Sequence, residues 1–282
     1  MSEVETQQEG FTGKRKPNQF GRAIFLLITI VCFIYLYFRL NGAAAREGLT
    51  FAVYMSQVFA NVQWIPWLIL MMAYSGIYFF IDTLVVTRAL NWFIEKLRFS
   101  DIMPIRACAY IISIFNEQIG KGAMAYYLNK RDGVPGWEVG SVMLFIMFCE
   151  IFYLLIWATI GYVFSSTSLP SEFAIIPFIA LGALVFFILW MMYFQGVILP
   201  NHEFRNRRIL HAFKLARLRH YLMFFLLRSP ALITAVIVYT IALRLFGVEA
   251  SFLSLLGYLP VIFFAAAVPT PMRAAAITFW VI

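Results

Sequence analysis

The sequence predicts an all-α, polytopic helical membrane protein, and three observations indicate this fold class. Hydrophobic residues fill 62% of the 282 positions and charged residues only 13%, whereas a soluble domain carries about 25% charged residues. The chain has 30 Phe and 7 Trp, and aromatic side chains suit lipid contact and the membrane interface. The apolar residues also gather in runs long enough to cross a bilayer as helices. We therefore expect one multi-span membrane domain over residues 22–282.

The polar residues 1–21 are expected to form a disordered cytoplasmic tail. Basic residues within this tail, and Arg22 just after it, precede the first apolar run, 23–40, as they do in a signal sequence. Two interpretations stay open. The long polar lead and Arg39 favour an uncleaved signal-anchor, whereas the alanines at 43–45 could mark a cleavage site. We expect a multi-pass protein of the plasma (inner) membrane with a cytoplasmic N-terminus.

The following segments alternate between spans and interfacial elements. Residues 50–62 have apolar residues at helical spacing but are too short and polar to cross, so they predict an interfacial helix. A basic stretch, 201–228, predicts an amphipathic helix on the cytoplasmic leaflet, after which Ser229 and Pro230 would start the next span. The predicted spans after the first are 66–87, with Trp64 and Trp67 as anchors, 139–164, 173–199 and 230–246.

Segment 107–128 has the length of a span but a polar centre with two glycines. If the segment enters and returns on one side, the cytoplasm holds all of the 22 Lys and Arg residues except Arg39, Arg46, Arg244 and Arg273. If it crosses, every later loop changes sides and the basic residues are divided almost evenly. Cytoplasmic loops of membrane proteins carry the excess of Lys and Arg, so the sequence favours a re-entrant element here.

The last stretch, 251–282, is apolar but broken by Pro269, Thr270 and Pro271. We expect a second re-entrant element that enters from the opposite face. Two such elements are compatible with an inverted repeat, an arrangement found in transporters whose broken helices meet near the midplane. Because the chain stops within apolar sequence, we also expect the natural protein to continue beyond Ile282.

Ionisable residues inside apolar segments are candidates for a substrate path, because charge is costly in hydrocarbon. Glu117 and Lys121, four residues apart on one helical face, could bind an amine and a phosphate, or could form a structural ion pair. Arg273 could bind an anionic headgroup or extend to the interface. Glu150 is expected to pair with Arg273 or Lys121. The predicted path comprises Asn116, Glu117, Lys121, Glu150 and Arg273, while Asp82 and Arg88 are interpreted as structural residues near a membrane edge.

Other function classes lack their motifs. His202 and Glu203 begin like a zinc-protease helix, but Asn206 occupies the position of the second His. Gly120 and Lys121 lack the preceding glycine of a phosphate loop. The three cysteines lie in apolar runs without ligand spacing. We expect no catalytic residue, metal or cofactor. The net charge of +8 comes from short stretches between apolar segments, which indicates an anionic membrane surface and not nucleic acid.

Two stretches, 112–131 (ISIFNEQIGKGAMAYYLNKR) and 259–277 (LPVIFFAAAVPTPMRAAAI), resemble the transmembrane region of the lysylphosphatidylglycerol synthase/flippase family. The family has a break followed by a Gly and a Tyr-x-Leu-x-(Lys/Arg) exit in the first stretch, and a Pro-x-Pro break in the second. This chain departs at Gln118 and at Gly120-Lys121, where the family usually has an Arg and a Gly-Glu. The second break lacks the family's glycines and has Ala274 where an acidic residue follows Arg273. The resemblance therefore implies an architecture and no particular substrate.

The expected function is a flippase-like lipid translocase, which moves or handles an anionic or aminoacylated lipid headgroup across the bilayer. The alternative is a membrane-embedded subunit or remnant of a lipid-modifying transferase. In the family the aminoacylating activity resides in a separate soluble domain, and no loop here is long enough to hold one, so we expect no enzyme activity. The expected partners are membrane lipids, anionic ones above all, and not nucleic acid. A membrane-protein partner or a homo-oligomer stays open.

Overall fold

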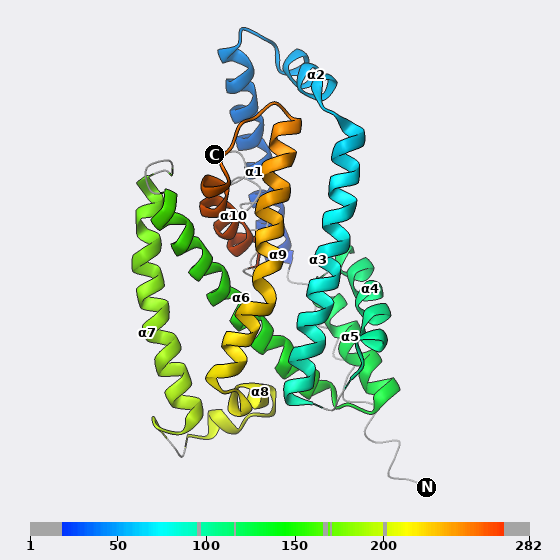
Figure 1. Cartoon of the computed structure of the whole chain (residues 1–282), viewed down its shortest axis with the longest axis vertical. Helices are drawn as coiled ribbons and strands as arrows, with labels where there is room; N and C mark the ends of the chain where they lie inside the picture. The colour runs from blue at the N-terminus through cyan, green and yellow to red at the C-terminus, as the bar shows by residue number, and fades with distance from the viewer. Residues whose placement is uncertain are drawn as a thin grey trace. The chain divides into compact units, whose positions relative to one another are not determined.

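The computed structural model describes residues 19–94, 97–115, 117–165, 169, 171–199 and 202–267. The chain divides into two compact units, residues 1–51 with 269–282 and residues 52–268, and each is described by itself. All regular secondary structure in the described residues is helical, which confirms the all-α fold class (Figure 1). In chain order the α-helices are α1 (Gln19–Arg46), α2 (Phe51–Asn61), α3 (Trp64–Phe93), α4 (Phe99–Phe115), α5 (Glu117–Asp132), α6 (Gly136–Ser165), α7 (Ile176–Gln195), α8 (His211–Leu215), α9 (Leu218–Leu245) and α10 (Phe252–Ala267).

Four helical segments of the larger unit are long and apolar enough to cross a membrane. They are Trp64–Phe93, Gly136–Ser165, Phe173–Gln195 and Leu218–Leu245. The third consists of a 3₁₀ turn, Ser171–Ile175, that leads into α7. Three of the predicted spans are confirmed as helices, and α3 continues six residues beyond its predicted end at 87. The chain is therefore a polytopic helical membrane protein.

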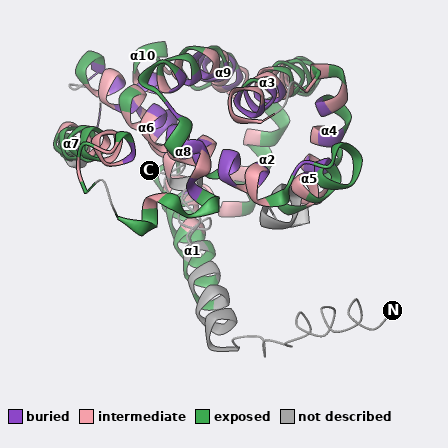
Figure 2. Ribbon diagram, turned by 90° about the horizontal axis from the view of Figure 1, so that it is seen from below, coloured by how far each residue is buried: buried purple, intermediate pink, exposed green. Residues whose placement is uncertain are grey.

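The buried faces of α3, α6 and α9 form the core of the larger unit. Figure 2 shows buried residues on these helices, whereas α7 is exposed over most of its surface. α9 packs against α3 and α10, and α6 packs against α10. Where α6 meets α10, Gly161 lies so close to Gly257 that a Cβ at position 161 would be 2.6 Å from the Gly257 Cα atom. Small residues allow such close approach of membrane helices.

α4 and α5 pack against each other as a helical hairpin. Its two ends meet, because Nη1 of Arg131 in the last turn of α5 donates to the carbonyl oxygen of Asp101 in the first turn of α4, at 3.3 Å. A single continuous span would hold these residues far apart. Segment 107–128 therefore turns back on itself between α4 and α5, as predicted. The depth to which this hairpin enters a membrane stays a prediction.

The prediction of one amphipathic helix over 201–228 is wrong. The chain instead forms two 3₁₀ turns, Glu203–Asn206 and Arg208–Leu210, then the short helix α8, and residues 218–228 belong to α9. The backbone N–H of Arg217 donates to Nδ1 of His220, a contact that starts α9 twelve residues before the predicted span. Ser229 and Pro230 lie inside α9 and not at its start, since membrane helices tolerate an internal proline.

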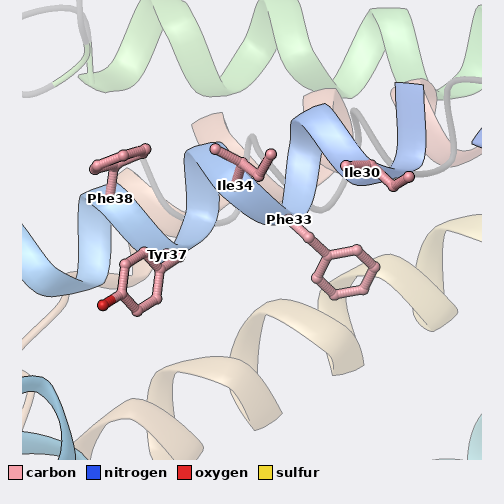
Figure 3. A pocket seen from close by; sticks show the side chains of 5 residues that line it. All are labelled: Ile30, Phe33, Ile34, Tyr37 and Phe38. Atoms are coloured by element: carbon pink, nitrogen blue, oxygen red, sulfur yellow. The ribbon is translucent and has the colours of Figure 1, made fainter. Parts of the chain in front are cut away.

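Helices α1 and α2 coincide with two further predicted elements. α1 contains the predicted first span, 23–40, and presents an exposed apolar face on which Ile30, Phe33, Ile34, Tyr37 and Phe38 line a shallow pocket (Figure 3). α2 matches the predicted interfacial helix 50–62 and has no buried residue. The indole N–H of Trp64 donates to the Phe59 carbonyl oxygen at 3.0 Å, which joins the end of α2 to the start of α3.

Candidate functional site

Four charged side chains from four helices meet inside the larger unit. They are Asp82 of α3, Arg106 of α4, Glu150 of α6 and Arg228 of α9, and we call them the buried charge cluster. Nη1 of Arg228 donates to Oδ1 of Asp82 at 2.9 Å, and Nη2 donates to Oε1 of Glu150 at 2.7 Å. Nε of Arg106 donates to Oδ2 of Asp82 at 3.0 Å. Two carboxylates thus face two guanidinium groups, and the cluster carries no net formal charge.

Tyrosine side chains complete the surroundings of Arg228 and Arg106. Nη2 of Arg228 also donates to the hydroxyl of Tyr78 at 2.8 Å. The hydroxyl of Tyr153 donates to the Arg228 backbone carbonyl at 3.1 Å. The guanidinium of Arg106 lies 5.0 Å from the centre of the Tyr110 ring, within the range of a cation–π contact. Arg228 is therefore held through both its side chain and its backbone.

The cluster lies deep within the spanning helices. Arg228 is ten residues from the start of α9, Asp82 is eleven from the end of α3, and Glu150 is fourteen from the start of α6. At about 1.5 Å per residue, these positions are roughly 15–20 Å from the helix ends. The helices themselves are roughly 42–45 Å long, so the charges lie in their middle part, where an isolated charge is most costly.

The local sequences of α9 and α3 explain how these two helices carry a charge at this depth. Arg228 stands between FLL and SPALITAV, so that apolar residues extend α9 on both sides of it. Pro230 cannot donate a backbone hydrogen bond, and the Ser229 hydroxyl donates to the Phe225 carbonyl oxygen in the same turn, at 2.7 Å. In α3, the hydroxyls of Thr83 and Thr87 likewise donate to carbonyls four residues earlier, so their polarity is satisfied within the helix.

The four side chains differ in how firmly they are held. Both carboxylate oxygens of Asp82 accept from a guanidinium, and its side chain is only 9% exposed. Among the described residues Glu150 accepts through a single oxygen, and its side chain is 29% exposed against 7% for Arg228. The Arg228–Glu150 contact is therefore the one that can open with the least rearrangement.

This geometry gives partners that the sequence did not predict. Glu150 pairs with Arg228. Its expected pairing with Lys121 or Arg273 involves side chains outside the described residues and stays a prediction. Because α3 extends to Phe93, Asp82 lies well inside the helix, where it bridges two arginines. Its place near a membrane edge stays a prediction. Arg88, which was grouped with Asp82, is exposed on the same helix.

The other predicted path residues stay untested. Asn116 and Arg273 lie outside the described residues, and although Glu117 and Lys121 belong to α5, their side chains also lie outside them. Of the predicted set, Glu150 alone can be placed in the cluster. Sequence reasoning missed Arg228 and Arg106 because the charge count assigned both to cytoplasmic loops. The signal that could have found Arg228 is the run of mostly apolar residues on both sides of it, 221–227 and 231–243.

Comparison with known proteins does not identify this chain. No family model, curated protein or solved structure matches it. The resemblance to the lysylphosphatidylglycerol synthase/flippase family therefore stays a prediction. The function must be inferred from the site itself.

The chemistry available in the cluster is ionic exchange and proton binding. Among the described residues no group of three His, Cys, Asp or Glu side chains is placed to hold a metal ion. Arg228 presents guanidinium N–H groups suited to a phosphate or carboxylate, which it can bind in a bidentate manner. Glu150 presents a partly exposed carboxylate suited to an ammonium group or a proton.

Proposed function

We propose that this protein moves lipids with a charged headgroup across the membrane, and that the Arg228–Glu150 pair lies on the headgroup's path. The observation that supports this proposal is a set of four charged side chains, of which three lie at mid-depth in the spanning helices α3, α6 and α9 and one, Arg106, comes from α4. Charged residues in membrane spans mark substrate, ion or proton paths more often than they serve packing. The proposal requires no covalent chemistry.

The energetic argument starts from the cost of the cluster. Inserting one Arg or Asp at the centre of a membrane helix costs about 2.5–3.5 kcal/mol on insertion scales. Pairing offsets this cost, but well-packed apolar residues commonly hold helices together as well as a buried ion pair does. Helix packing alone therefore does not require four charged residues from four helices to contact one another. Their presence favours a role in binding.

The residues of the buried charge cluster differ in burial and in number of contacts, and this difference indicates where the lipid headgroup would bind. Arg106 and Asp82 form its fixed part, because Asp82 is bound by two guanidiniums and is almost fully buried. Arg228 and Glu150 form its exchangeable part, because Glu150 is partly exposed and held by one contact. In this proposal a headgroup phosphate takes the place of Glu150 on Arg228, and an amine on the headgroup, where one is present, binds the released carboxylate. The acyl chains stay in the surrounding lipid.

The test is lipid translocation by the purified full chain in proteoliposomes, with fluorescent phosphatidylglycerol as the probe and dithionite quenching as the readout. Wild-type protein should accelerate probe movement over empty liposomes. Glu150→Gln and Arg228→Lys should each lower the rate at least tenfold, whereas Glu249→Gln, which alters an exposed carboxylate outside the cluster, should leave it unchanged. Folded variants that translocate at the wild-type rate would show that the charges are structural and would refute the proposed path.

A further inference from the structure

A second feature of the larger unit is an apolar groove between α6, α7 and α9, with a volume of about 650 Å³. This volume lies within the 300–1,000 Å³ that ligand pockets commonly have. On α7 the groove is lined at positions 177, 180, 181, 183, 184 and 187, the spacing of a single helical face. It lies outside the buried charge cluster, because none of the four charged residues lines it.

The groove wall presents hydrocarbon and little polarity. The hydroxyl of Thr159 donates to the Leu155 carbonyl oxygen within α6, at 2.8 Å, and the hydroxyl of Tyr153 donates to the Arg228 carbonyl. These two polar groups are therefore satisfied by the protein and do not call for a polar ligand. Large apolar side chains of the wall stay open to the surroundings, with Leu181 62% and Leu222 56% exposed.

The dimensions of the groove fit an acyl chain in one leaflet. Its lining runs from Cys149 to Ile160 along α6 and from Pro177 to Phe187 along α7. At about 1.5 Å per residue these stretches are roughly 15–17 Å long, which is close to half of the ~30 Å hydrocarbon thickness of a bilayer. All three helices belong to segments that can span a membrane, so lipid chains are the molecules that reach this surface.

Charge at one end of the groove indicates which lipid it holds. Leu218, the first residue of α9, lines the groove, and its two neighbours Arg217 and Arg219 are both exposed. Among the described residues neither arginine forms an ion pair with a carboxylate. An anionic headgroup would supply the missing negative charge, since basic residues at a membrane surface attract anionic lipids.

We propose that the groove between α6, α7 and α9 is a binding site for one anionic phospholipid, with an acyl chain along the groove and the headgroup at Arg217 and Arg219. The site does not depend on the translocation proposed above, because equilibrium binding in the groove requires neither Glu150 nor the side chain of Arg228.

The experiment is native mass spectrometry of the purified full chain titrated with phosphatidylglycerol or with phosphatidylcholine of identical acyl chains. One phosphatidylglycerol should bind more tightly than phosphatidylcholine. Ala183→Trp, which fills the groove, should abolish this binding, whereas Val185→Trp should preserve it. Val185 is the matched control because it lies on the same helix, is 51% exposed and does not line the groove.

Arg217→Gln and Arg219→Gln should each reduce the preference for phosphatidylglycerol, by roughly fivefold per arginine, while Arg88→Gln, at an exposed site on α3, should not.

Glu150→Gln should bind the lipid normally, so a failure of translocation and a failure of this site are distinguishable. Equal binding of the two lipids by wild-type protein would overturn the anionic assignment. A dimer that is lost in Ala183→Trp, with no bound lipid, would show that a second copy of the chain occupies the groove.

If Ala183→Trp fails to fold, photo-cross-linking of wild-type protein with a phosphatidylglycerol that has a photoreactive acyl chain tests whether the lipid occupies the groove. Cross-links to the groove-facing residues of α6, α7 and α9 are expected. Cross-links confined to other faces of the protein would overturn the proposal.

Discussion

Arg228 shows how strongly a single residue depends on its partners. Its guanidinium is 7% exposed and touches Asp82, Glu150 and Tyr78, three groups from two other helices. The sequence assigned it to a basic loop, beside residues such as Arg219 that are exposed. Both residues lie on α9 only nine positions apart, yet one is at the surface and the other at the centre of the unit. Neighbours in the tertiary structure, and not residue type, separate their roles.

We predict that Arg228→Leu lowers the free energy of unfolding by about 3–5 kcal/mol, because it leaves Glu150 without its partner and Asp82 with one of its two. Arg219→Leu on the same helix is the control and should change stability by less than about 0.5 kcal/mol. Unfolding by dodecyl sulfate titration in mixed micelles, followed by circular dichroism, measures both. Equal stability of the two variants would contradict the buried cluster.

At the scale of elements, close helix contacts fix where the charged residues lie. α3 packs against α9, which brings Asp82 to Arg228, and α6 packs against α10 at Gly161 and Gly257. The predicted boundaries of α9 were wrong because Ser-Pro is a common helix start in water. In a membrane helix the same pair can remain internal, because Ser229 bonds within its own helix.

Gly161→Ala should destabilise the protein by about 1–3 kcal/mol, since the added Cβ would clash with the backbone of α10 at Gly257. Gly182→Ala on α7 is the matched control. A Cβ at position 182 meets nothing within 4 Å, and alanine is the better helix former, so this change should be neutral or stabilising. The same dodecyl sulfate titration compares the two. A neutral effect of Gly161→Ala would mean that α6 and α10 do not approach closely.

The positions of the helix ends in the larger unit indicate which segments lie on the same side of the membrane. In the larger unit the end of α3, the two ends of the α4–α5 hairpin, the start of α6 and helix α8 all lie at one end (Figure 1). Four basic residues of the predicted cytoplasmic loops, Arg88, Lys130, Arg131 and Lys214, belong to these segments. The loop between α9 and α10, with Glu249, lies at the other end. This arrangement agrees with the charge distribution expected of a membrane protein.

Cysteines introduced singly at Ser100 and Lys130 should react with a membrane-impermeant maleimide from the same side, and a cysteine at Glu249 from the opposite side. All three positions are exposed, and the experiment uses full chain in sealed vesicles, with the native cysteines replaced and the cysteine-free protein as background. Labelling of positions 100 and 130 from opposite sides would show that 107–128 crosses the membrane and would refute the hairpin.

The sequence by itself determined the class of the protein and most of its helices. Low charge and long apolar runs require a lipid solvent, and the uneven distribution of Lys and Arg was enough to predict that 107–128 turns back. These properties are local or additive, so a single chain displays them directly. Among the predicted path residues, the sequence also identified Glu150 correctly as a mid-span charge.

The tertiary structure alone decided which charges meet. The four residues of the buried charge cluster lie as many as 146 positions apart along the chain. A hydropathy scale assigns each residue a cost without its partners, so it cannot predict which charged residues pair. Arg228 can remain inside an apolar helix only because Asp82 and Glu150 offset its charge there. That compensation arises when α3, α6 and α9 pack together, so no single segment of the sequence could reveal it.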